Sequence, residues 1–313
     1  MTRIIAVAGA TGAQGGGLAR AILDEADSGF AVRALTRDPN SDAARALAER
    51  GAEVVAADLD DPRSLRAAFE GAHGAFCMTN FWEHFSPERE KAQARNQAEA
   101  ARAAGVGHVV WSTLEDTRER VPLSDDRMPT LMGEYKVPHF DAKGESDEVF
   151  LDLTPATCLR TSFYWDNLIH FGMGPKRENG TVHFSLPLGD ARLPGMAAGD
   201  IGRCVLGVFR EGESLIGQKI GVAGGHPTGL EMAAALTDAL GEEVVYRAVP
   251  FEVYRGLGFP GAEDLGNMFQ YKHDFEEEYC ATRPIDRSRE LNPRLQTFPE
   301  WASANADRIP IGG

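Results

Sequence analysis

The sequence predicts an α/β fold with a doubly wound parallel sheet and a smaller C-terminal lobe. Short apolar runs alternate with helical patterns through the first half of the chain, as in a parallel sheet with helices on both faces. The first run, at 3–9, breaks directly into a glycine-rich turn and then a helical pattern. The alternation weakens after residue 160, where turn-rich segments begin. We therefore expect the sheet in the first half and the lobe in the second.

Each element of the first half is predicted from its own pattern. Apolar and β-branched runs predict strands at 3–9, 30–36, 53–57, 75–79, 108–113 and 157–161. Apolar residues at helical spacing predict helices at 43–50, 64–69, 88–104 and 138–150. Residues 117–131 are polar and contain two prolines, so we expect a loop that covers a ligand.

The second half is predicted more sparsely. Strands are expected at 181–186, 218–222 and 244–249, and helices at 200–209 and 228–240. Thr228, with Glu231 three residues later, matches a capping box at the start of the last helix. The expected boundaries are 1–160 for the sheet domain, with segments at about 196–223 returning to it, and 161–195 with 224–313 for the smaller lobe.

Composition narrows the class of protein. The 313 residues carry a formal net charge of −15, which argues against a surface that binds nucleic acid directly. Apolar stretches are too short for a transmembrane helix, and the first residues do not resemble a secretory leader. The four cysteines are scattered without metal-ligand spacing, so we expect reduced thiols, no metal site and a cytoplasmic location.

The turn after the first strand has the spacing of a pyrophosphate-binding loop. Gly9 permits the tight turn, Gly12 lets phosphates approach the backbone, and Gly15 lets the helix pack closely on the strand. Because the turn opens a helix, free N–H groups and a positive helix end face the same point. The turn lies between a predicted strand and a predicted helix, so an ordinary surface turn is the weaker interpretation. The sequence therefore predicts a Rossmann sheet that binds a dinucleotide.

The end of the second strand indicates which dinucleotide. NAD-binding proteins place an acidic residue here for the ribose 2′-hydroxyl, whereas this chain has Thr36 and Arg37. A guanidinium suits a 2′-phosphate, so we predict NADP(H), although Arg37 as an ordinary solvated arginine is the alternative. Asp58 and Leu59, after the third strand, are expected at the adenine edge.

Several further motifs, together with this loop, resemble the NmrA-like family, an atypical group of the short-chain dehydrogenase/reductase superfamily. The resemblance covers nearly the whole chain and is greatest to the branch that binds NADP(H) as a redox sensor. Other members of the family are NADPH-dependent reductases, including quinone reductases. The motifs are Gly9-Ala10-Thr11-Gly12-Ala13-Gln14-Gly15, Thr36-Arg37-Asp38-Pro39, Thr79-Asn80-Phe81-Trp82-Glu83, His139-Phe140-Asp141-Ala142-Lys143-Gly144 and Tyr164-Trp165-Asp166-Asn167.

The resemblance implies a role for each motif. The loop from Ala10 to Gly15 would hold the pyrophosphate, and Lys143 would hydrogen-bond the nicotinamide ribose. The 2′-phosphate would lie among Arg37, Asp38, Pro39, Asn40 and Ser41. The nicotinamide would lie beside Thr79, Asn80 and Phe81, under Tyr164, Trp165, Asp166 and Asn167. A core role for the aromatic run around Tyr164 and Trp165 is the alternative.

The acid–base pair of the superfamily is incomplete in this chain. A tyrosine four residues before the lysine normally donates a proton, but His139 stands four residues before Lys143. His139 and Ser112, at the end of the fifth strand, are the remaining candidates. Packing beside the ribose is the favoured interpretation of His139, and capping of the strand end is an alternative for Ser112. No catalytic residue is assigned.

Two functions follow from these observations. The favoured one is an NADP(H) redox sensor, monomeric or homodimeric, with little or no dehydrogenase turnover and a regulatory protein partner. The alternative is an NADPH-dependent reductase of quinones or similar small electrophiles, whose products solvent can protonate.

Overall fold

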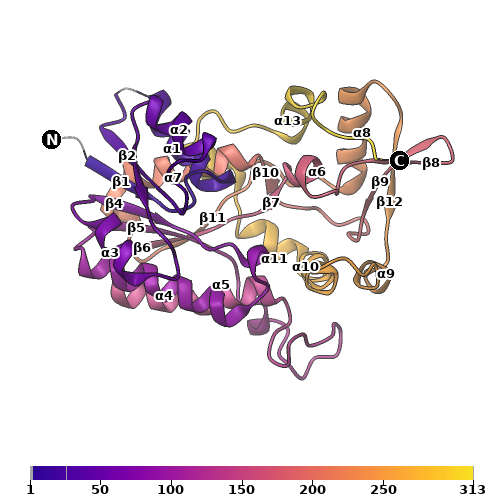
Figure 1. The fold of residues 1–313 in the computed structure, drawn as a ribbon. Helices are drawn as coiled ribbons and strands as arrows, with labels where there is room; N and C mark the ends of the chain where they lie inside the picture. Colours follow the sequence, from indigo (N-terminus) through magenta and orange to yellow (C-terminus); the bar gives the residue numbers. More distant parts are fainter. Residues whose placement is uncertain (1–2, 26, 313) are drawn as a thin grey trace.

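The computed structural model describes residues 3–25 and 27–312. A seven-stranded parallel sheet has the order β11-β6-β5-β4-β1-β2-β3 (Figure 1). The order reverses between β1 and β4, and such a switch point opens a crevice at the carboxyl ends of the strands. The strands are β1 (Arg3–Val7), β2 (Phe30–Thr36), β3 (Glu53–Ala56), β4 (Gly74–Cys77), β5 (His108–Thr113), β6 (Ala156–Arg160) and β11 (Lys219–Gly221).

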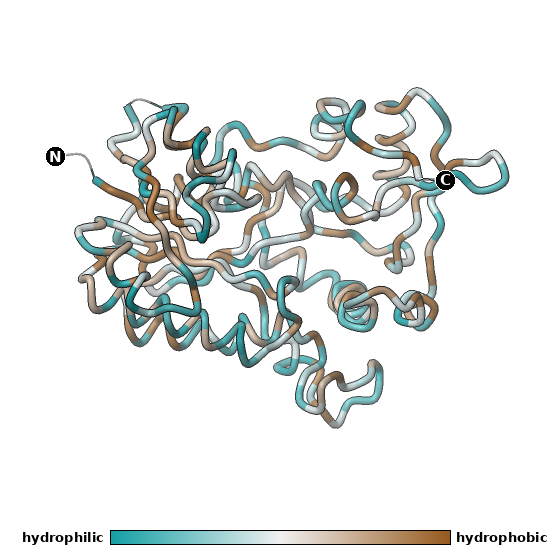
Figure 2. The backbone as a smooth tube through the Cα atoms, in the orientation of Figure 1, coloured by the Kyte–Doolittle hydropathy of each residue, from teal (hydrophilic) through white to brown (hydrophobic). Residues whose placement is uncertain are grey.

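Helices cover both faces of this sheet (Figure 1). One face carries α1 (Ala13–Asp24), α2 (Asp42–Glu49) and α7 (Ala198–Glu211). The other carries α3 (Pro62–Phe69), α4 (Pro87–Ala103) and α5 (Pro138–Leu153). A separate apolar core lies under each set of helices, which explains why the central strands are apolar on both faces. The hydropathy of each residue along the backbone is drawn in Figure 2.

Helices α1 and α7 cross with their backbones in close approach. A Cβ placed on Gly202 would lie 2.0 Å from the backbone nitrogen of Leu18. No side chain fits there, so the crossing requires glycine.

The C-terminal part is built around a third apolar core. Its three-stranded sheet has the order β12-β9-β8, and β7 pairs with β10 beside it. These strands are β7 (Phe163–Tyr164), β8 (Lys176–Glu178), β9 (Thr181–Leu186), β10 (Gly195–Met196) and β12 (Val244–Ala248). Its helices are α6 (Asn167–His170), α8 (Gly229–Leu240), α9 (Phe251–Arg255), α10 (Ala262–Asp274), α11 (Glu276–Ala281) and α13 (Phe298–Ala304). Helix α12 (Ile285–Leu291) packs on α7, and its Leu291 belongs to the core on that face of the large sheet. Short 3₁₀ helices lie at Phe81–Glu83, Thr117–Glu119 and Gly212–Leu215.

The fold class predicted from the sequence is confirmed. The strands at 30–36, 108–113 and 181–186 have the predicted bounds, and Thr228 and Glu231 form the predicted capping box. The edge strand β11 belongs to the large sheet. Among the described residues, no helix combines the length and apolar character that a membrane span requires.

Candidate functional site

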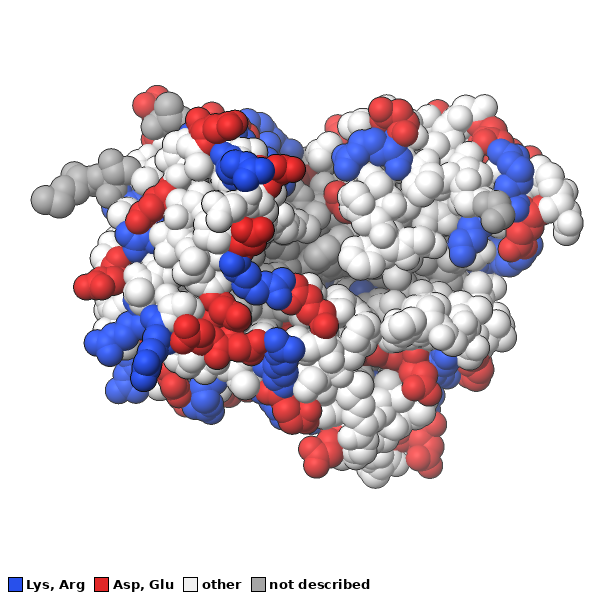
Figure 3. All heavy atoms as spheres, in the orientation of Figure 1, with Lys and Arg blue, Asp and Glu red and all other residues white. Residues whose placement is uncertain are grey.

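A cavity of about 1560 Å³ lies between the carboxyl ends of the large sheet and the C-terminal part. We call it the cleft, and the space-filling view shows the molecule hollowed between these two parts (Figure 3). Its lining runs from Gly9 on the glycine turn, past Lys143 on α5, to Lys272 on α10. Segments that are far apart in the sequence therefore share one continuous space.

The glycine turn lies at the sheet end of the cleft. Gly9 has φ +62°, a conformation that favours glycine, and its carbonyl accepts from Gly12 N–H at 2.9 Å. A Cβ on Gly15 would lie 2.4 Å from the Ala8 carbonyl oxygen, so this glycine permits the close approach of α1 to β1. None of the described side chains caps α1, which leaves its first N–H groups available at the cleft. These features fit a bound pyrophosphate.

Arg37 reaches the cleft from the end of β2. Its guanidinium forms a fork with the Glu83 carboxylate at 2.9 and 3.1 Å, and about 64% of the Arg37 side chain is exposed. Thr36, Asp38 and Ser41 line the same end of the cleft. Glu83 thus occupies the fork that an incoming phosphate would take.

The turn that follows β3 forms another part of the cleft lining. Asp58 and Leu59 follow β3 and line the cleft. Asp58 Oδ1 accepts from the backbone N–H of Asp60 at 3.0 Å, and Arg89 binds the Asp60 carboxylate. The turn is therefore fixed by its own contacts.

Lys143 is held by a buried carboxylate. Its ammonium lies 2.8 Å from Glu90 Oε1 and donates to the hydroxyl and carbonyl oxygens of Thr79 at 2.7 and 3.1 Å. Glu90 is fully buried and also accepts from the Thr79 hydroxyl at 2.6 Å. Two of the three N–H donors of the ammonium therefore go to Thr79, and the ion pair with Glu90 holds the group in place. Lys143 thus fixes Thr79 at the edge of the cleft.

His139 is held by an aspartate from the C-terminal part. Its Nδ1 bonds to Asp264 Oδ1, and its backbone N–H donates to Asp264 Oδ2 at 3.1 Å. Because Asp264 engages Nδ1, Nε2 is the ring nitrogen that remains for another partner. The imidazole is 4.8 Å from the Trp82 ring and lines the cleft. This pair resembles the carboxylate–imidazole arrangements that orient a histidine for proton transfer.

Three polar side chains form a chain across the centre of the cleft. The Ser112 hydroxyl donates to Gln14 Oε1 at 2.7 Å, and Gln14 Nε2 donates to the Tyr164 hydroxyl oxygen. This direction leaves the hydroxyl hydrogen of Tyr164 free to be donated. Burial raises the pKa of Tyr164 to about 12, so the phenol stays protonated at neutral pH.

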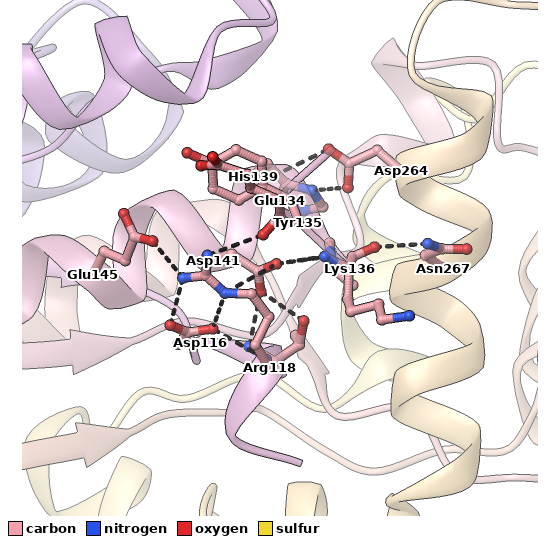
Figure 4. Close-up of polar contacts among 12 residues, drawn as sticks. Asp116, Arg118, Glu134, Tyr135, Lys136, His139, Asp141, Glu145, Asp264 and Asn267 are labelled. Carbon is pink, nitrogen blue, oxygen red and sulfur yellow. Dashed lines mark hydrogen bonds and ion pairs between the residues drawn. The ribbon is translucent and has the colours of Figure 1, made fainter. Parts of the chain in front are cut away.

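The start of α5, which carries His139 and Lys143, is clamped from two sides (Figure 4). The buried Asp141 carboxylate accepts from the backbone N–H groups of Thr117, Lys136 and Val137 at 2.8 to 3.0 Å. Burial raises the pKa of Asp141, and these hydrogen bonds oppose the rise. Asp264 reaches His139 from α10 on the other side. The cleft side chains of α5 are therefore rigidly placed.

Some predicted residues lie outside the described lining of the cleft. Trp165 was expected to cover the nicotinamide, but it is fully buried in the core, 5.4 Å from the Phe298 ring. Asp166 turns away and accepts from Ala198 N–H at the start of α7, at 2.8 Å. The described lining also leaves out Ala10, Gly15, Pro39 and Asn40. Thr11, Gly12, Ala13, Gln14, Asn80, Phe81 and Asn167 do line the cleft.

The expectation that residues 117–131 cover a ligand is wrong. None of these residues belongs to the described lining. The loop packs against α10 instead, where Asn267 and Gln270 donate to its carbonyl groups at Pro129 and Arg127. These contacts satisfy the backbone of the loop away from the cleft.

Sequence reasoning missed Glu90, Asp264 and Lys272. Glu90 and Asp264 are 53 and 125 residues from their partners, so the sequence alone offers no signal for either pairing. Lys272 did leave a signal, because Leu265, Met268, Phe269 and Lys272 have the spacing of one helical face. A lysine on that apolar stripe must point inward.

The comparisons agree with this architecture. A family model described as the NmrA-like family matches residues 1–302. The NmrA-like family domain-containing oxidoreductase FrzB of Cladobotryum sp is 32% identical over 304 residues, with 91% of this chain and 88% of that protein covered. The NAD(P)H azoreductase of Xenophilus azovorans is 29% identical over 310 residues, covering 97% and 98%. The structure of NmrA, a negative transcriptional regulator, in complex with NADP is 23% identical, with a TM-score of 0.78 and 97% and 95% covered.

Proposed function

The chain belongs to the NmrA-like family, and on that premise we propose that it is an NADPH-dependent reductase of quinones or similar small electrophiles. One observation carries the proposal. The cleft runs without interruption from the glycine turn at Gly9 to an aromatic interior around Phe140 and Phe163. Such a space accommodates a dinucleotide and, beyond it, an apolar molecule.

The relatives favour a reductase over the redox sensor that sequence analysis preferred. FrzB is named an oxidoreductase, and the azoreductase is named for its use of NAD(P)H. The regulator NmrA shares the fold at an identity too low to carry a function. The redox sensor is therefore the alternative from which an experiment must distinguish the reductase.

The residues of the sheet end would hold the cofactor. The turn from Gly9 to Gln14 would bind the pyrophosphate, and Arg37 with Ser41 would bind the 2′-phosphate. Asp58 and Leu59 would flank the adenine. When bound, NADPH supplies a hydride. The preference for NADPH over NADH rests on Arg37, because Thr36 and Arg37 stand at the end of β2, where NAD-binding proteins place an acidic residue.

The remaining residues would orient the reactants and move protons. Thr79, fixed by Lys143 and Glu90, would bound the nicotinamide side of the cleft. Tyr164 can donate its hydroxyl hydrogen, since the hydrogen bond from Gln14 orients the phenol without consuming that donor. His139, oriented by its contact with Asp264, can pass a proton through Nε2.

The acceptor would be an apolar electrophile. Phe140, Phe163 and Met268 line the inner cleft, and such side chains favour flat, weakly polar molecules. Reduction of a quinone needs less assistance from a protein acid than reduction of a simple ketone. The missing tyrosine of the superfamily pair is therefore compatible with turnover.

The surroundings we propose are cytoplasmic. All four cysteines are free and buried, and burial raises the pKa of the Cys77 thiol, as expected for inert structural cysteines. The strongly negative net charge disfavours direct contact with nucleic acid.

The test is NADPH oxidation by the purified protein in the presence of a panel of quinones, followed at the absorption band of the reduced nicotinamide. We expect steady oxidation that scales with protein concentration. Tight NADPH binding without oxidation across the panel would instead support the sensor.

A further inference from the structure

Lys272 of α10 lies at the inner end of the cleft inside a box of aromatic rings. Only about 2% of the residue is exposed, yet it belongs to the cleft lining. Its ammonium is 5.5 Å from the ring centroids of Phe140 and Tyr279, and 5.8 Å from those of Phe163 and Phe269. The rings come from α5, β7, α10 and α11, so the box is assembled only in the folded protein.

This ammonium lacks an oxygen acceptor among the described residues. Its one hydrogen-bond contact is the Met268 sulfur at 3.4 Å, a weak acceptor for a group with three N–H donors. Burial, together with the nearby Arg283 and against an opposing effect of Glu115, lowers the pKa of Lys272 to about 7. Burying an ammonium without an oxygen acceptor costs free energy of folding, so this lysine is a candidate for ligand binding.

Tyr279, in the wall of the same box, presents a second unused polar group. Its hydroxyl is buried and has no hydrogen-bond partner within the part of the chain that the structure describes. The Arg283 guanidinium stacks 3.7 Å from the centroid of the Tyr279 ring. The Arg283 guanidinium donates two hydrogen bonds to the Glu115 carboxylate, at 2.7 and 2.9 Å. Lys272 and Tyr279 are therefore the free donors of the box.

The box adjoins the centre of the cleft. Phe140 precedes Lys143 by one helical turn on α5, so the two side chains lie on the same face. Phe163 directly precedes Tyr164, whose hydroxyl is bonded to Gln14. A planar molecule among the rings would lie next to the residues that we assign to the nicotinamide.

We propose that this box is the acceptor subsite, in which Lys272 and Tyr279 donate hydrogen bonds to a carbonyl oxygen of a planar quinone held in the cleft against the Phe140 and Phe163 rings. The inference rests on the proposed function, which it deepens by naming the substrate class and the groups that bind it. A bare cation–π role for Lys272 would leave the Tyr279 hydroxyl unexplained.

The proton balance of the step is complete. The quinone accepts a hydride from NADPH and becomes a hydroquinone monoanion. The Lys272 ammonium gives one proton to the anionic oxygen, which yields neutral hydroquinone and a neutral amine. The amine then regains a proton from solvent. Activity should therefore fall as the pH rises through about 7, because the ammonium is lost.

The test compares Lys272→Met and Tyr279→Phe with the unmodified protein. The probe is tetramethyl-1,4-benzoquinone, whose ring positions are blocked against addition of amines. Its binding is measured without cofactor, by quenching of tryptophan fluorescence, and kcat/KM is measured against pH with NADPH. We expect each variant to weaken quinone binding by about tenfold, the effect of losing one good hydrogen bond. Lys272→Met should also abolish the fall in kcat/KM near pH 7.

Controls separate this subsite from other effects. Tyr271→Phe removes the hydroxyl of a buried tyrosine outside the cleft lining and should behave like the unmodified protein. The affinity for NADPH should be unchanged in all variants. Lys272→Met should fold, because below about pH 7 the native lysine is charged at a cost that the unfolded chain does not bear. Its melting temperature at pH 6 should be equal to or above that of the unmodified protein.

The outcomes distinguish the two proposals. Equal quinone binding by all variants would overturn the subsite, even if turnover is observed. Quinone binding that depends on Lys272 and Tyr279, without NADPH oxidation by the unmodified protein, would support the subsite and overturn the reductase.

Discussion

Two of the three buried basic side chains in the described cleft lining are paired with carboxylates. Lys143 meets Glu90 and His139 meets Asp264, and both carboxylates are almost completely buried. Pairing compensates the loss of hydration when a charge is buried. Lys272 is the exception, since aromatic rings surround it instead. Unpaired polar groups at this depth are the residues to examine for ligand binding.

At the same scale, Arg37 should determine the choice of cofactor. We predict that Arg37→Ala weakens NADPH binding by about tenfold and leaves NADH binding nearly unchanged, since a charge-assisted fork at an exposed site contributes a modest free energy. Glu83→Gln should strengthen NADPH binding by removing the competing carboxylate. Titration calorimetry with both cofactors measures these effects.

A matched control is Arg66→Ala, which changes an exposed arginine outside the cleft lining. It should bind both cofactors like the unmodified protein. A preference for NADH in the unmodified protein, or equal losses for both cofactors in Arg37→Ala, would remove Arg37 from the 2′-phosphate site.

Site residues were predictable where the backbone position itself carries the function. The glycine turn and Arg37 follow a strand directly, so their place in the cleft follows from local sequence. Trp165 was misplaced because an aromatic run after a strand suits a pocket wall and a core equally well. Asp264 could not be predicted, because its contact with His139 depends on how α10 docks against α5.

At the scale of elements, the crossing of α1 and α7 offers a stability test. We predict that Gly202→Ala destabilises the protein by several kcal/mol, because the new Cβ would lie 2.0 Å from backbone that cannot move aside. Gly199 is one turn away on α7, and a Cβ there would meet nothing within 4 Å. Gly199→Ala should be neutral or slightly stabilising, since alanine favours the helix. Chemical denaturation of both variants gives the comparison.

Similar unfolding midpoints for the two variants would show that the helices separate more easily than their packing indicates. A loss of stability in Gly199→Ala as large as that in Gly202→Ala would likewise contradict a specific requirement for glycine at position 202.

Helices and strands were predictable from the sequence when they were long and when their hydropathy differed clearly from that of the flanking residues. The strand at 108–113 is centred on the apolar run from Val109 to Trp111, and its bounds match the prediction. The pair β7 and β10 has two residues in each strand, too few for any periodicity to emerge. The helices after residue 250 are short, and tertiary packing decides their limits.

At the scale of the whole molecule, the cleft exists because two parts with separate cores face each other. The sheet supplies the turn and Arg37, whereas the C-terminal part supplies Asp264 and the Lys272 box. Charges of both signs are interspersed over the face seen in Figure 3, and the inner cleft is aromatic. This division places a polar cofactor site and an apolar acceptor site end to end.

The central claim is that hydride passes from NADPH to a quinone in this cleft. The most direct measurement is single-turnover oxidation of NADPH, with protein in excess over the cofactor and tetramethyl-1,4-benzoquinone present. It is repeated with NADPH carrying deuterium at both C4 positions of the nicotinamide. The account predicts oxidation that requires the protein and proceeds more slowly with the deuterated cofactor. Persistence of bound NADPH over many minutes, at the rate seen without protein, would contradict it.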